Sequence, residues 1–227
     1  YKEYNFCSYF NALSIEKWKK YTNIKKFYLI LDIEGKFEVS LDGYHLEAEV
    51  DQRTRYLKKK FQNDSREKVE IEIPLDNQEM LFAFSIRAYS DCVLYGGTYD
   101  AIIDEDELNE VNIAISTTTF RKEEYIKTNV EMIKNELISD PYMGEHWFMH
   151  VVDNGRTLER EEIESKHIFY HPNKNVGGAG GFARGMIEVL DQKEPITHIL
   201  LMDDDVLIYA EALKRTYYLL HMIKEKY

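Results

Sequence analysis

The spacing of apolar residues changes near residue 110, and this change limits the folds that the chain can adopt. Before it, segments such as residues 36–41 alternate apolar and polar side chains, which is the pattern of a half-buried β-strand. After it, short β-forming segments such as 111–116 alternate with helical ones, which is typical of a parallel α/β sheet. Short strands at the spacing seen in the first half indicate an antiparallel sandwich or barrel. We therefore predict two domains: an antiparallel β-sandwich of the jelly-roll type over residues 1–110, and an α/β domain over residues 111–227.

Local signals place the elements within these two domains. In the first half we expect one helix, with Ser14 as its N-cap, and turns at Gly35, Gly43 and 96–97, where glycines interrupt the β-forming segments. The expected strands of this half are 27–31, 36–41, 44–50, 68–73, 80–89 and 98–103. In the second half we expect strands at 111–116, 147–152, 167–170 and 198–202, with helices at 122–137, 181–190 and 209–227.

Composition narrows the functional classes. Lys and Arg total 29 against 41 Asp and Glu, a formal net charge of −12, which argues against a protein that follows nucleic-acid phosphates. No apolar segment approaches the roughly 20 residues that span a bilayer, and no basic-then-apolar leader is visible. The two cysteines, Cys7 and Cys92, lie far apart, which fits a reducing compartment. These features predict a cytoplasmic protein without a transmembrane segment, and the first residue, Tyr1, suggests a piece of a longer chain.

Polar clusters follow each predicted strand of the second half. They occupy residues 117–121, 153–155, 173–181 and 203–205. In an open parallel sheet, ligands bind beyond the carboxyl ends of the strands. The four loops are therefore expected to converge on one edge and to form a binding site there.

Three consecutive aspartates, Asp203, Asp204 and Asp205, directly follow an apolar strand. Three carboxylates so close together repel one another unless a cation or strong donors balance them. Carboxylate oxygens favour Mg²⁺ or Mn²⁺, completed by phosphate oxygens of a substrate. A solvated turn that caps the next helix is the alternative interpretation.

A second signal is the density of glycines between residues 175 and 186, which hold five of the eleven in the chain. Glycine allows a ligand to approach the backbone closely, and amides at a helix start can bind an anion. Residues 178–183 also fit the dinucleotide fingerprint G-x-G-x-x-G/A. The fingerprint should open directly from its strand, whereas residues 171–175 intervene here. A nicotinamide-dependent oxidoreductase is therefore the weaker alternative.

The ordered set of motifs in residues 111–209 resembles the family 2 inverting glycosyltransferases of the GT-A fold. Within that family, the glycine-rich motif of residues 177–185 and the preceding β-domain most resemble those of galactofuranosyltransferases with an N-terminal β-sandwich. The resemblance implies that residues 111–227 are the nucleotide-binding, Rossmann-like half of a GT-A domain. It also implies transfer of a sugar, galactofuranose from UDP-galactofuranose, onto a cell-surface glycan with inversion.

The resemblance also assigns roles to residues. It implies that Thr119, Phe120 and Arg121 line the uridine-diphosphate pocket, with Arg121 contacting the pyrophosphate. It implies that Asp153 and Asn154 form hydrogen bonds with uracil or ribose.

The resemblance also implies roles for the glycine-rich motif and for the three aspartates. The resemblance implies that Asn175 and Gly178 border the nucleotide and donor sugar, and that Arg184 orders this loop. Asp203 and Asp205 would face Mn²⁺ or Mg²⁺ and the ribose, and Asp204 the donor sugar. The ion would offset charge developing on the leaving diphosphate.

The sequence ends one predicted helix after the aspartates, so the general base that such enzymes use is expected beyond Tyr227 and no catalytic residue is assigned. We expect this piece alone to be inactive. The implied partners are a UDP-sugar donor and a glycan acceptor, without nucleic acid; a homo-oligomer and a position at the inner face of the plasma membrane are further expectations. A non-catalytic carbohydrate-binding or scaffold protein is the alternative from another functional class.

Overall fold

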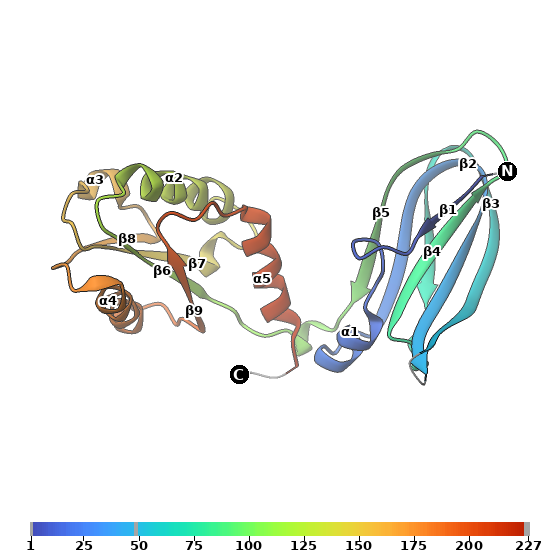
Figure 1. Ribbon diagram of the computed structural model, residues 1–227, viewed down its shortest axis with the longest axis horizontal. Helices are drawn as coiled ribbons and strands as arrows, with labels where there is room; N and C mark the ends of the chain where they lie inside the picture. Colours follow the sequence, from blue (N-terminus) through green and yellow to red (C-terminus); the bar gives the residue numbers. More distant parts are fainter. Residues whose placement is uncertain (1, 48–49, 225–227) are drawn as a thin grey trace. The chain divides into compact units, whose positions relative to one another are not determined.

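The structure is a computed structural model that describes residues 2–47 and 50–224 (Figure 1). The elements form two compact units. The first extends to Leu108 and includes the residues from Met222 onward, and the second spans Asn109–His221. Each unit has a hydrophobic core of its own. No helix among the described residues is both long and apolar enough to cross a bilayer.

The first unit is built from antiparallel strands. Its sheet has the order β1-β4-β2-β3, and β5 pairs with the part of β2 that β4 does not reach. Helix α1 and a short 3-10 turn, η1, complete the unit. The bounds of these elements are β1 Lys2–Phe6, α1 Ile15–Tyr21, β2 Lys26–Glu47, β3 Val50–Ile73, β4 Leu81–Ala88, β5 Val93–Ile102 and η1 Glu105–Glu107.

Two predicted turns of this unit are bulges inside β2. The register with β3 shifts between Ile33 and Gly35 and again between Leu41 and Asp42, while the strand itself continues. Gly35 has φ of +105°, a conformation that glycine supplies at a bulge as readily as at a turn. Turn and bulge therefore share one sequence signal. Gly96 and Gly97 likewise lie within β5, and the predicted turn there is also wrong.

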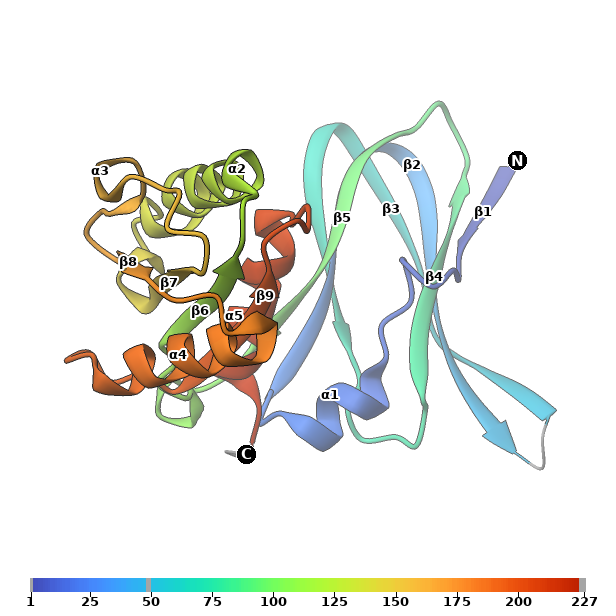
Figure 2. The same cartoon turned by 60° about the vertical axis from the view of Figure 1, so that its left-hand side comes forward.

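The predicted two-sheet sandwich is corrected by the pairing pattern. The five described strands belong to a single hydrogen-bonded sheet. Figure 2 shows how the long β2 and β3 curve, so that one sheet partly encloses its own core. Bulges increase the bend and twist of a strand, which explains how a single sheet covers both sides. The core of the first unit comprises Leu13, Ile15, Phe27, Leu29, Leu31, Ile33, Phe37, Val39, Leu41, Val69, Ile71, Ile73, Phe82, Phe84 and Ile86.

The second unit contains the predicted parallel sheet, with the strand order β8-β7-β6-β9. The bounds are β6 Ile113–Thr119, α2 Glu123–Ile133, η2 Lys134–Ile138, η3 Gly144–His146, β7 Trp147–Asp153, α3 Arg160–Ile163, β8 Ile168–Pro172, α4 Gly177–Asp191, β9 His198–Asp203 and α5 Ala210–Met222. Strand β6 is longer than predicted, because residues 117–119, expected as a loop, continue the ladder with β7. Threonine favours strands.

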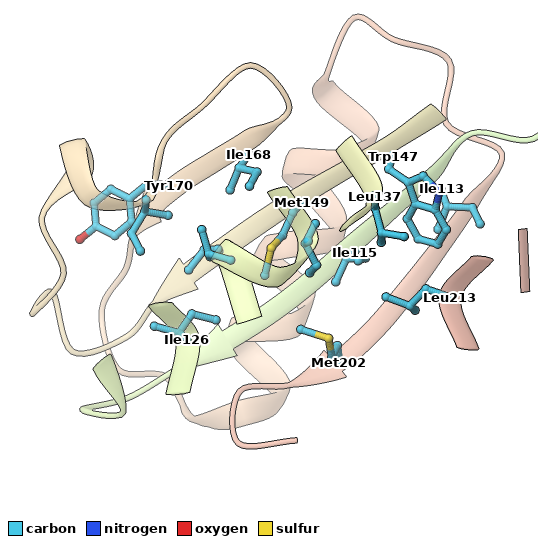
Figure 3. Packing of buried hydrophobic residues seen from close by; sticks show 14 of the residues in the cluster. Ile113, Ile115, Ile126, Leu137, Trp147, Met149, Ile168, Tyr170, Met202 and Leu213 are labelled. Carbon is cyan, nitrogen blue, oxygen red and sulfur yellow. The ribbon is translucent and has the colours of Figure 1, made fainter. Parts of the chain in front are cut away.

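Helices cover both faces of this sheet (Figure 1). Helices α2 and α5 contribute to one core, in which Ile126 packs with Ile115 and Met149 (Figure 3). Helix α4 packs on the other face, where Val189 meets Ala114. The spacing of apolar residues along α2 directs one stripe toward the sheet, as its helical period requires.

The strand order determines where a ligand would bind. Numbered along the chain, the strands of the second unit lie in the order 3-2-1-4, the order of the first half of doubly wound nucleotide-binding sheets. The order reverses between β6 and β9, since the chain leaves β6 toward β7 on one side and later returns as β9 on the other. Such a switch point opens a crevice between the two loops that follow these strands.

Candidate functional site

The loops after β6 and β9 bring basic and acidic side chains together at the switch point. Lys122 follows β6, and its Nζ lies 3.7 Å from Asp204 Oδ1 and forms a closer ion pair with Asp205 Oδ2. The hydrogen bond from Lys122 lowers the pKa of Asp205, and the same bond raises the pKa of Lys122. The carboxyl edge of the sheet therefore already holds a cation, an ammonium, between two of the three predicted aspartates.

The three aspartates differ in their surroundings. Asp204 is 9% exposed, and its backbone oxygen accepts a hydrogen bond from Asn129 of α2 at 3.1 Å. Asp203 and Asp205 are exposed. Among the described residues, no three His, Cys, Asp or Glu side chains are grouped so that they could hold a metal. A divalent ion would fit the oxygen donors and the charge here if waters or phosphate oxygens completed its coordination, as is usual for Mg²⁺, which is often held by only one or two carboxylates.

Buried hydroxyls without partners mark the end of β6. The side-chain oxygens of Ser116, Thr117, Thr118 and Thr119 are buried and have no hydrogen-bond partner within the described residues. Thr119, predicted to line the nucleotide pocket, is only 2% exposed. Unpartnered buried polar groups are uncommon and call for an explanation, such as a water or ligand that satisfies them. Thr119 is the member of the set closest in sequence to the crevice.

Arg121 and Phe120 form the rim of the same loop. The guanidinium carbon of Arg121 lies 5.2 Å from the centre of the Phe120 ring, which is 44% exposed. Arg121 has φ of +58°, a left-handed conformation that costs a non-glycine residue about 1 kcal/mol or more. Backbone strain of this kind concentrates at binding sites. Arg121, which is predicted to contact the pyrophosphate, thus lies in the loop that also carries Lys122, and its described side-chain contact is with Phe120.

Asp153, at the end of β7, is 0% exposed. Its Oδ1 accepts hydrogen bonds from the backbone N–H groups of Gly155 and Arg156, and its Oδ2 accepts them from those of Thr157 and Leu158. The hydroxyl of Tyr170 is a further donor at 3.2 Å; burial and the Asp153 carboxylate raise the pKa of Tyr170 to about 12. This geometry does not support the predicted contact of Asp153 with uracil or ribose, because the carboxylate is fully used in ordering its own loop.

Asn154 joins three of the predicted loops. Its backbone N–H donates to Thr119 O at 2.9 Å, and its Nδ2 donates to Gly177 O at 3.2 Å. Its Oδ1 accepts from Asn173 Nδ2 at 2.9 Å. These bonds fix the ends of β6 and β7 against the start of α4, so the convergence of loops that the sequence predicts is present around Asn154.

The start of α4 is open toward solvent. Asn175 Oδ1 accepts from the N–H of Gly177 at 3.1 Å, and a side chain built at Gly178 would meet no atom within 4 Å. Packing within the chain therefore does not require a glycine at position 178. A glycine at an open helix start leaves space for a ligand to approach the backbone.

Arg184 lies nearly two turns further along α4 than Gly178 and pairs with Glu188 on the same helix. Glu188 Oε2 is 3.6 Å from His171 Nδ1, and His171 Nε2 is 3.0 Å from His150 Nδ1. Burial lowers the pKa of His150 and brings that of His171 to about 4, so both rings are neutral at pH 7. Arg184 thus belongs to a chain of contacts along α4. Its described partner lies on the same helix, and its ordering of the glycine-rich loop stays a prediction.

Sequence reasoning missed Lys122 and the His150–His171 pair. A basic residue directly after the strand at the switch point was a signal for Lys122. A hollow of about 400 Å³ next to Asp205 was also not foreseen. It is lined by Glu124, Tyr125, Thr128, Asn129, Asp205, Val206 and Leu207. The hollow extends the crevice along α2.

An open parallel sheet with polar loops gathered at its switch point is characteristic of an α/β ligand-binding unit. Comparison with known proteins gives a more specific relationship. Residues 1–101 match the family described as Galactofuranosyltransferase 2 N-terminal. The chain is also 25% identical, over 227 residues, to the galactofuranosyltransferase GlfT2 of Mycobacterium tuberculosis. The predicted similarity to galactofuranosyltransferases with an N-terminal β-domain is therefore confirmed.

The match covers very different shares of the two proteins. The match covers 94% of this chain and 34% of the mycobacterial protein, so the chain spans about a third of its relative. Among solved structures, the endo-1,4-beta-D-xylanase 10B of Clostridium thermocellum, complexed with xylohexaose, is matched with a TM-score of 0.25 at 9% identity. That match covers 57% of this chain and 26% of the xylanase chain, and a likeness this low carries no argument.

Proposed function

We propose that the second unit binds the nucleotide-sugar donor of a galactofuranosyltransferase, UDP-galactofuranose, as the donor-binding half of a GT-A domain. The observation that carries the proposal is the crevice between β6 and β9, where Lys122 pairs with the carboxylates of Asp204 and Asp205 and Arg121 is its neighbour in the same loop. A crevice with both cationic donors and carboxylates suits a diphosphate that arrives with a divalent cation.

Each side of the crevice has a proposed part in binding. Arg121 and Lys122 supply positive charge to the diphosphate, and Thr119 and Phe120 border the nucleoside. Asn154 holds the loops in place and, with Asn175 and Gly178, borders the nucleotide and the donor sugar. Asp153 acts one step away from the ligand, by ordering residues 154–158 through backbone hydrogen bonds.

Mn²⁺ or Mg²⁺ is the proposed cofactor, held by Asp203 and Asp205 with Asp204 toward the donor sugar. The ion, when bound, would offset the negative charge that develops on the leaving diphosphate. The protein then holds the donor for displacement by a glycan acceptor with inversion. We assign no general base to the described residues.

The dinucleotide-cofactor alternative fits the topology less well. The Gly-rich fingerprint belongs to the first strand–helix turn of a dinucleotide-binding sheet, at the switch point. Here the glycine-rich helix α4 follows β8, which is an edge strand, and residues 173–176 separate the two. Topology therefore favours a nucleotide-sugar over a nicotinamide cofactor.

The direct test is calorimetric binding of UDP to the chain with Mn²⁺ and with EDTA. We expect binding to be at least about tenfold tighter with Mn²⁺, since each tenfold step corresponds to about 1.4 kcal/mol and the ion adds bonds to both carboxylate and phosphate. NADH serves as the matched ligand from the alternative class. Equal affinity for UDP with and without metal would contradict the metal-assisted site, and tighter binding of NADH would favour the oxidoreductase.

A further inference from the structure

We propose that Lys122 is a built-in counterion of the acidic loop, that a divalent cation must displace it, and that the displaced ammonium then binds the diphosphate of the donor. The inference rests on the proposed function, because it concerns the same crevice. In this proposal the Lys122 ammonium moves from the aspartate carboxylates to the donor diphosphate. Removal of the Lys122 charge should therefore strengthen metal binding and weaken nucleotide binding.

The location of Lys122 is the first argument. Lys122 is the residue that precedes α2 as its N-cap, and its side chain makes no capping hydrogen bond. A positive charge is unfavourable at a helix N-terminus, where the helix dipole is itself positive. Its position therefore works against α2, although Glu123 and Glu124 in the first turn partly offset this. Stabilisation of the helix does not explain a lysine here, whereas neutralisation of the aspartates across the crevice does.

The contacts of Lys122 give the second argument. Its ammonium bridges two carboxylates, Asp204 and Asp205, that belong to a different loop 82 or more residues away. A divalent cation that bound Asp205 through Oδ2 would need the oxygen that Lys122 contacts, and it would repel the ammonium at such short range. The two cations therefore compete for one site. Metal binding releases Lys122 from its carboxylate partners.

The surroundings give the released side chain a partner. The lysine stem is flexible and its head is a compact charge, so it can turn within the crevice without a change of backbone. Arg121 is its neighbour in the chain, and the unpartnered hydroxyl of Thr119 lies three residues before it. A diphosphate that satisfied Arg121 and coordinated the metal would place its remaining oxygens within this group of donors. The lysine that blocks the empty site thus becomes a ligand of the filled one.

The test compares Lys122→Met with the wild-type chain in two titrations. Without nucleotide, Mn²⁺ alone should bind Lys122→Met about three- to fivefold more tightly, because an exposed competing ion pair contributes up to about 1 kcal/mol. With saturating Mn²⁺, UDP should bind the same variant about tenfold more weakly, because a charge-assisted contact with the diphosphate is lost. Paramagnetic resonance of free Mn²⁺ and calorimetry with UDP measure these affinities without any turnover.

Two further variants control the experiment. Lys127 lies on α2 and pairs with Glu162 at 2.8 Å, so Lys127→Met removes a similar ion pair away from the crevice and should change neither affinity. Lys122→Arg keeps the charge and should restore UDP binding to within about threefold of wild type.

The outcomes separate the inference from the proposed function. Manganese-dependent UDP binding by the wild type, with neither affinity altered in Lys122→Met, would overturn the role of Lys122 and leave the proposed function standing. A wild-type chain that binds no UDP with Mn²⁺ would overturn both. A fall of Mn²⁺ affinity in Lys122→Met would also refute the inference, since competition requires a rise.

Discussion

The Asp153→Ala variant should lose at least about 3 kcal/mol of unfolding free energy in the second unit, because five donors, two of them buried, lose a charged acceptor at once. Four backbone N–H groups and the Tyr170 hydroxyl converge on this carboxylate, which is 0% exposed. A methyl group can accept none of these bonds, and the Leu158 N–H and the Tyr170 hydroxyl would be left buried without this acceptor. Nucleotide binding should weaken as well, since the loop that carries Asn154 is no longer ordered.

Chemical unfolding followed by tryptophan fluorescence measures this loss. The chain has two tryptophans: Trp147 is fully buried in the core of the second unit, and Trp18 packs in the first. A Trp18→Phe background therefore leaves a signal from the second unit alone. Asp153→Asn, which keeps one acceptor oxygen, should fall between wild type and Asp153→Ala.

Asp140 provides a matched control. Its Oδ1 accepts hydrogen bonds from two backbone N–H groups, those of Tyr142 and Met143, so Asp140→Ala should cost about 1 kcal/mol. If Asp153→Ala cost no more than Asp140→Ala, the Asp153 carboxylate would not hold its loop as described. The predicted direct contact with the ligand would then regain its support.

The class of each unit could be predicted from local patterns, because alternation and helical periodicity report which faces of an element are buried. Which strand segments pair with one another was harder to predict from the sequence. The glycine at position 35 signals both a turn and a bulge, and only the continuous ladder with β3 distinguishes them. For the same reason, strands predicted as separate pieces are parts of one long β2, and the two-sheet arrangement inferred from them was wrong.

The gathering of polar loops at one edge of the sheet was predictable, and the bonds between them were not. Parallel strands bring their carboxyl ends to one edge, so polar residues after each strand identify that edge without coordinates. Sequence alone cannot tell whether a carboxylate at this edge faces a ligand or its own loop. Asp153 is enclosed by residues that follow it within five positions, whereas Asp205 faces a lysine more than 80 residues away. A contact such as that between Asp205 and Lys122 depends on which strands are neighbours in the sheet, and this is not evident from the local sequence.

Two glycines of α4 should respond in opposite ways when replaced by alanine. A Cβ at Gly181 would lie 2.1 Å from Thr118 Cγ2 and 3.0 Å from Thr118 Cβ. Because Thr118 is a β-branched residue of β6 that packs against α4, the side chain has little freedom to turn away, and the helix would have to move. Gly181→Ala should therefore destabilise the second unit by about 3 kcal/mol, near the upper end of the usual cost of overpacking. A Cβ at Gly178 would meet nothing within 4 Å, and Gly178→Ala should leave stability unchanged or raise it by up to about 1 kcal/mol through helix propensity.

The Gly178 and Gly181 variants should also be distinguished by UDP binding and by a second substitution at Thr118. If the start of α4 borders a nucleotide, Gly178→Ala should weaken UDP binding by about tenfold or more while the protein stays fully folded, because the new methyl group occupies the space that the ligand needs. Thr118→Ala combined with Gly181→Ala should recover much of the stability lost in Gly181→Ala, since it removes the Cγ2 and Oγ1 atoms that the new methyl would meet. Unfolding curves and UDP titrations of the same variants test both statements. A stable Gly178→Ala variant with wild-type affinity for UDP would show that the ligand does not approach α4 at this residue.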